Sequence, residues 1–152
     1  MNQQELFNEQ AKALTILSIA IMSGVVIFSG VSLLVHSSEG AFIATSSQTR
    51  NIIFGTMLFL AMIFIYLARF TFNKKVEGIR DSNTDLMQKL AAYRSATIFH
   101  HALCEVPATL GVVCFLLFGD YLFFIPVTMA ILEMIRKFPG RANINERIGT
   151  AY

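Results

Sequence analysis

Four long blocks of apolar residues, almost free of charge, constrain this chain more than any other feature of its sequence. Each block approaches the roughly 20 residues that a helix needs to cross about 30 Å of hydrocarbon at about 1.5 Å per residue. Within lipid only helices and closed barrels satisfy every backbone donor, and the blocks lack the alternation of barrel strands. We therefore predict four membrane helices, at about residues 13–35, 51–72, 95–118 and 120–137.

The composition supports a membrane protein with one domain. Hydrophobic residues make up 55% of the 152 positions and charged residues only 14%, which is more apolar surface than a soluble domain of this length can bury. We predict an all-α fold in which residues 1–152 form a single four-transmembrane-helix bundle.

The placement of the basic residues predicts how the bundle is oriented. Lys and Arg are frequent in the connection 73–94, at the end of the fourth block and in the tail 138–152. In contrast, only Arg50 lies near the connection between the first two blocks. Lys and Arg stay on the cytoplasmic side during insertion, so we expect both termini and the connection 73–94 to be cytoplasmic. The first block is longer than the apolar core of a signal peptide, so we expect no cleaved leader. The predicted location is a bacterial inner membrane.

The third block contains the polar residues that point most directly to function. Glu105 lies about 15 Å from Ser95 along the helix, near the bilayer midplane, where a charged side chain costs about 2.5 to 3.5 kcal/mol. Polar residues recur every four positions around Glu105, which predicts one polar face, and a basic residue lies at the cytoplasmic end of that face. The candidate proton, ion or polar ligand site comprises Arg94, Thr97, His101, Glu105 and Thr109.

Two prolines are predicted to bend the third and fourth helices. Pro107 removes a backbone donor next to Glu105, and Pro126 does the same in the fourth block, so that the hairpin of these two helices encloses a small polar cavity. Two interpretations of Glu105 stay open: a proton or ion relay together with His101, or a neutral side chain that hydrogen-bonds to serines or threonines of the first helix.

The first block is rich in small side chains, which let helix backbones approach closely. We therefore predict that the first helix is the packing centre of the bundle, and that much of the phenylalanine-rich second helix faces lipid. The residues predicted to pack helices together are Ala20, Ser23, Gly24, Gly30 and Gly111.

Several other sites are less informative. Glu133 precedes Arg136 and Lys137 by three and four residues, a spacing typical of exposed pairs, so we expect a snorkelling charge at the interface. His36 and His101 differ in depth by about 20 Å and cannot ligate one iron, so haem b is disfavoured and no metal site is predicted. The sequence contains no nucleotide loop, nucleophile elbow or paired-carboxylate motif, so neither an enzyme nor a nucleic-acid partner is expected.

The residues 102–105 and 111–118 resemble part of the second helix of proteolipid (c) subunits of rotary ATPases, where one mid-membrane carboxylate carries the ion. This resemblance implies an ion-carrying role for Glu105. The chain departs from that family because the preceding span lacks a glycine ladder, the loop 73–94 is longer, and two histidines precede Glu105. We assign no family on this stretch.

Two classes of function follow from these observations. The preferred one is an accessory or structural subunit that packs against partner helices in a membrane complex or homo-oligomer, because four helices are too few for an alternating-access pathway. The alternative is a proton- or ion-coupled transport element that uses Glu105 with His101.

Overall fold

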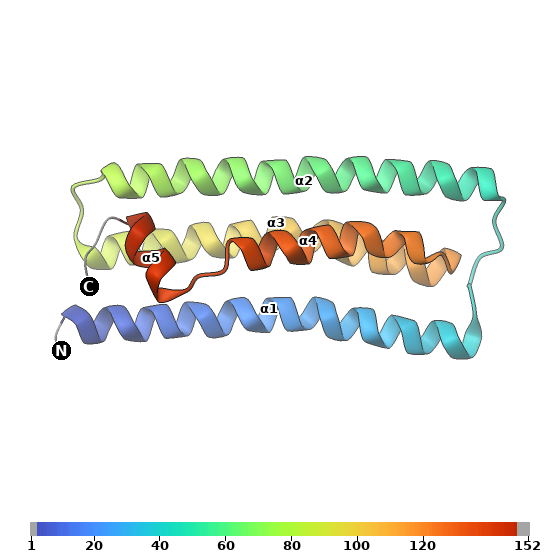
Figure 1. Ribbon diagram of the computed structural model, residues 1–152, viewed down its shortest axis with the longest axis horizontal. Coiled ribbons are helices and arrows are strands. Elements are labelled where there is room, and N and C mark those ends of the chain that lie inside the picture. Colours follow the sequence, from blue (N-terminus) through green and yellow to red (C-terminus); the bar gives the residue numbers. More distant parts are fainter. Residues whose placement is uncertain (1–2, 149–152) are drawn as a thin grey trace.

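The computed structural model describes residues 3–148, and this part of the chain is a bundle of helices without strands (Figure 1). Three long helices lie side by side, a shorter helix runs along the middle one, and a last short helix lies at the end where the first begins. We call that end the basic end and the opposite one the turn end. The elements are α1 (Gln3–Glu39), α2 (Ser47–Asp81), α3 (Leu86–Phe118), the 3-10 turn η1 (Tyr121–Phe123), α4 (Phe124–Arg136) and α5 (Arg141–Ile148).

The helices α1, α2 and α3 are long and apolar enough to cross a membrane. This confirms the prediction of an all-helical, multi-pass membrane bundle. The fourth predicted span, 120–137, is not confirmed: α4 has 13 residues, about 20 Å of helix, and is preceded by the 3-10 turn η1.

The connection 73–94 is helical for most of its length. Both α2 and α3 extend into it, and only residues 82–85 lie between them. The side chain of Ser82 donates to the carbonyl oxygen of Ile79 at 2.7 Å and so satisfies one of the last carbonyls of α2. At the other end of α2, Ser46 caps the helix by accepting from the backbone N–H of Thr49 at 3.2 Å.

The middle helix α3, and not α1, is the packing centre. α3 contacts α1, α2, α4, η1 and α5, whereas α1 packs mainly against α3, with a smaller contact to α5. One stripe with seven-residue spacing is buried on α1, and it includes Ala11, Ser18, Val25 and Ser32. The predicted packing residues of α1 lie on its other side: Ala20, Ser23, Gly24 and Gly30 are all exposed.

Several aromatic residues of α2 face outward, as expected for a helix with much of its surface toward lipid, whereas Phe72 is buried. Phe59, Tyr66 and Phe70 have exposed fractions of 60%, 66% and 53%. The buried residues of α2 recur at intervals of three and four positions from Met57 to Phe72, and this side of the helix packs on α3.

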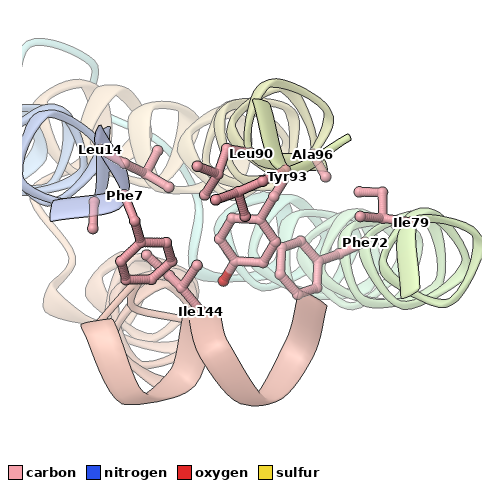
Figure 2. Packing of buried hydrophobic residues seen from close by; sticks show 10 residues of the cluster. Phe7, Leu14, Phe72, Ile79, Leu90, Tyr93, Ala96 and Ile144 are labelled. Carbon is pink, nitrogen blue, oxygen red and sulfur yellow. The ribbon is translucent and has the colours of Figure 1, made fainter. Parts of the chain in front are cut away.

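An apolar cluster closes the basic end of the bundle. Figure 2 shows Phe7 of α1, Phe72 of α2 and Ile144 of α5 around the ring of Tyr93 of α3. Arg147 of α5 donates to the hydroxyl oxygen of Tyr93 at 3.2 Å. Four helices therefore meet in this cluster, and α5 docks on it.

Close backbone contacts fix the turn end. Gly119 ends α3 with φ of 70°, a left-handed conformation that favours glycine, and its N–H donates to the carbonyl of Phe115 at 2.7 Å. The N–H of Ile43, in the connection 40–46, donates to the carbonyl of Leu117 at 2.8 Å. A Cβ atom on Gly111 would lie 2.8 Å from the carbonyl oxygen of Phe123. The absence of a side chain at Gly111 therefore lets α3 approach η1 and α4 closely.

The two prolines occupy different positions in their helices. Pro107 lies inside α3 and is buried, and the bend expected there stays a prediction. Pro126 is the third residue of α4, in the first turn, where backbone N–H groups have no intrahelical acceptor. It therefore lies at the start of α4, where the chain changes from 3-10 to α geometry, and not at a kink inside a fourth span.

Candidate functional site

The predicted polar face of α3 divides into a buried half and an exposed half. Thr97 and His101 are 1% and 0% exposed, whereas Glu105 and Thr109 are exposed on the outer surface of the helix. Each step of four residues turns an α-helix by about 40° beyond a full circle, so the stripe rotates by about 120° over its length. The structure therefore does not bring these four residues together in one cavity.

Glu105 lies on the surface of α3 that the other helices leave uncovered. It lines a shallow groove of about 370 Å³ together with Ala102, Val106, Thr109 and Leu110. No hydrogen bond or ion pair from the residues 3–148 reaches the Glu105 carboxylate. The side chain is thus a mid-helix carboxylate, among apolar neighbours, whose partner is not supplied by this part of the chain.

The groove continues along α3 toward the basic end. A second hollow of about 630 Å³ shares Ala102 with the first and is also lined by Gln10 of α1. Arg94 lies in it, 11 positions before Glu105 and therefore about 16 Å away along the helix. We call this combined surface the α3 groove. Its central lining residues are Arg94, Ser95, Ala102, Glu105, Thr109 and Leu110.

A second polar cluster is buried between α2, α3 and α4. The Glu133 side chain is 2% exposed; it accepts from Arg69 of α2 at 2.7 Å and from Arg136 at 3.1 Å. The Nε2 atom of His100 lies 3.6 Å from the same carboxylate. Glu133 is therefore not the exposed, snorkelling charge that the sequence predicted. The spacing to Arg136 does form a pair, but a partner from α2 buries the carboxylate.

The two adjacent histidines of α3 are both fully buried. The carbonyl oxygen of Thr97 accepts from Nδ1 of His101 at 2.9 Å, which leaves Nε2 as the acceptor nitrogen of that ring. Neither ring nitrogen of His100 has a hydrogen-bond partner among the described residues, and its ring packs edge-on against Phe72 at 5.3 Å between centroids. The alternative relay of His101 with Glu105 is therefore not assembled, since His101 points inward and Glu105 outward.

Among the residues 3–148, no group of three or more His, Cys, Asp and Glu side chains is arranged to hold a metal ion. His36 lies at the turn end, where its ring packs on those of Phe115 and Tyr121 at 4.9 and 6.2 Å.

The sequence carried one signal for the buried cluster. Arg69 lies inside the second apolar block and Glu133 inside the fourth, so two opposite charges occur at comparable positions near the basic ends of two neighbouring helices. Such charges are costly in lipid unless they pair. Reading the two blocks together would have predicted the ion pair.

Comparisons with protein-family models, with curated proteins and with solved structures give no match to this chain. The α3 groove and the buried cluster are therefore the features of this chain that bear on its function.

Proposed function

We propose that this protein is an accessory or structural subunit of a membrane complex, and that it binds a transmembrane helix of another subunit in the α3 groove. The observation that carries the proposal is Glu105, an exposed carboxylate in the middle of an apolar helix without a partner in the described chain. A charged side chain at the bilayer centre costs about 2.5 to 3.5 kcal/mol unless it is paired or neutralised. A partner helix that brings a hydrogen-bond donor or a cation removes that cost.

The orientation in the membrane follows from the positive-inside rule. The basic end carries Lys74, Lys75, Arg80 and Lys89 in and beside the α2–α3 connection, so it is cytoplasmic in our proposal. The continuous segment of η1 and α4, residues 121–136, is about 25 Å long and forms the fourth, short span. Both termini are then cytoplasmic.

The groove suits a helix better than an isolated lipid chain. Its floor has small residues, Ser95 and Ala102, that let another backbone approach. A second copy of this chain that used the same face by two-fold symmetry would oppose Glu105 to Glu105, without a basic group at that depth. We therefore favour a different subunit with a polar residue at the level of Glu105.

Site-specific photocrosslinking in cells tests this proposal. A photoreactive residue at position 102, in the groove, is expected to give one defined adduct. The same residue at 27 on α1 or at 59 on α2, both outward-facing, is expected to give none. Glu105→Leu removes the polar anchor and should abolish the adduct at 102, whereas the control Thr56→Leu, exposed on α2, should leave it unchanged.

The outcomes separate the proposals. An adduct with the mass of two copies of this chain would show that the groove binds a second copy, so that the protein forms a homo-oligomer and not a complex with a different subunit. The absence of an adduct at 102, or equal adducts at all three positions, would refute the docking groove.

The second candidate, ion-coupled transport, depends on the same outward carboxylate. The variant Glu105→Gln retains hydrogen bonding but cannot carry a proton. In our proposal this variant still assembles and any ion flux measured in proteoliposomes is unchanged. Loss of flux with normal assembly would favour the transport function.

A further inference from the structure

A small cleft at the basic end, between α2 and α4, is separate from the α3 groove. It has a volume of about 230 Å³ and is lined by Ile65, Arg69, Met129, Leu132, Glu133 and Arg136. Charged and apolar side chains thus share one hollow.

The charged and apolar residues of the cleft lie at different depths. Ile65 precedes Arg69 by four residues on α2, and Leu132 precedes Arg136 by four on α4. Both helices run toward the basic end (Figure 1), so the apolar side chains lie about 6 Å deeper than the two arginines. The cleft is therefore apolar toward the centre of the bundle and basic at its mouth.

The arginines keep donors available although both bind Glu133. Each guanidinium has five N–H donors, and each uses its Nη2 atom for the Glu133 carboxylate. The side chains of Arg69 and Arg136 are 45% and 54% exposed. Two positive charges and one negative charge leave a net charge of +1 at the mouth. Lys137 and Arg147 add positive charge close by, each 5.3 Å from the Phe72 ring.

We propose that this cleft binds one anionic phospholipid, with the phosphate between Arg69 and Arg136 and the start of an acyl chain against Ile65 and Leu132. Two arginines match the geometry of phosphate oxygens, and basic residues at the membrane surface attract anionic headgroups. The apolar depth of the cleft selects a lipid over a free phosphate ion, because a free ion contacts only the mouth. Glu133 also lines the cleft, but both of its carboxylate oxygens are paired with the arginines, so its role is to hold the two guanidiniums in place.

Native mass spectrometry of the detergent-solubilised full chain tests the proposal, with phosphatidylglycerol, phosphatidylcholine and inorganic phosphate added in turn. We expect one phosphatidylglycerol to be retained, and phosphatidylcholine and inorganic phosphate to be lost. Arg136→Gln, which leaves the Arg69–Glu133 pair intact, should lower retention about fivefold. The matched control Arg80→Gln removes the same charge from an exposed position on α2 and should change retention less than twofold.

A second variant keeps every charge in place. Leu132 is 60% exposed, so Leu132→Trp is tolerated by the fold, fills the apolar part of the cleft and should also lower phosphatidylglycerol retention. Equal retention of both lipids, equal effects of Arg136→Gln and Arg80→Gln, or no effect of Leu132→Trp would overturn the proposal. Retention of inorganic phosphate without lipid would assign the site to a free anion instead.

Discussion

The two partners of the buried ion pair should differ in what their removal costs, because they differ in exposure. The Glu133 side chain is 2% exposed and that of Arg69 is 45% exposed. In the variant Arg69→Met the Glu133 carboxylate stays buried, and Arg136, at 3.1 Å, is the one arginine that still pairs with it. In Glu133→Gln both arginines are able to turn toward water, and the amide oxygen still accepts a hydrogen bond.

The expected magnitudes follow from this asymmetry. Removing one partner of a buried pair costs about 3 to 5 kcal/mol, whereas exposed pairs contribute about 0.2 to 1 kcal/mol. Since Arg136 remains, we expect Arg69→Met to lower the free energy of unfolding by about 3 kcal/mol. Glu133→Gln should lower it by only about 1 kcal/mol. The difference of about 2 kcal/mol is roughly a 30-fold change in the unfolding equilibrium constant.

Equilibrium unfolding in mixed micelles, with rising sodium dodecyl sulfate and detection by circular dichroism, measures these values. The double variant Arg69→Met/Glu133→Gln no longer buries a carboxylate that has lost one of its two arginine partners, and it should recover most of the difference of about 2 kcal/mol. Two results would contradict this reasoning: Glu133→Gln destabilises the protein as much as Arg69→Met, or the double variant is no more stable than Arg69→Met. Either one would show that burial of the Glu133 carboxylate does not determine the loss of stability.

Three further perturbations have defined outcomes in the same unfolding assay. Gly111→Ala places a Cβ 2.8 Å from a backbone oxygen and should destabilise the bundle by about 1 to 3 kcal/mol. At Gly24 a Cβ would meet nothing within 4 Å beyond the neighbouring backbone of its own helix, so Gly24→Ala should be neutral or stabilising by up to about 1 kcal/mol. Disruption of the 2.9 Å pair between Arg50 and Asp120 by Arg50→Gln should cost about 0.2 to 1 kcal/mol, and the loss should shrink in high salt. Glu105→Leu should leave the isolated chain as stable as before or more stable, because it removes an unpaired polar group; marked destabilisation would show that Glu105 is anchored within the chain.

The length of the apolar blocks was sufficient to predict α1, α2 and α3, because a helix in lipid satisfies its own backbone and needs only enough residues. The same rule was insufficient for the residues 120–137. Their composition is apolar, but the 3-10 turn and the position of Pro126 in the first turn of α4 depend on where the chain leaves Gly119.

Which face of a helix is buried could not be predicted from one helix. Small residues occur on both sides of α1, and the stripe with Ser18 and Ser32, not the one with Ala20 and Gly24, meets α3. For Glu133 the local spacing to Arg136 was read correctly as a pair. Its burial depends on Arg69, which is 64 residues away in the sequence, and a local pattern contains no information on such a contact.

The docking of α5 has a consequence for biogenesis. The ribosome releases residues 141–148 after the three long helices have emerged, so the rings of Phe7, Phe72 and Tyr93 stay without the cover of α5 until that helix has been synthesised. Insertion into the bilayer and closure of the basic end are then successive events. A nascent chain stalled before Ile144 therefore leaves those apolar rings without their last packing partner.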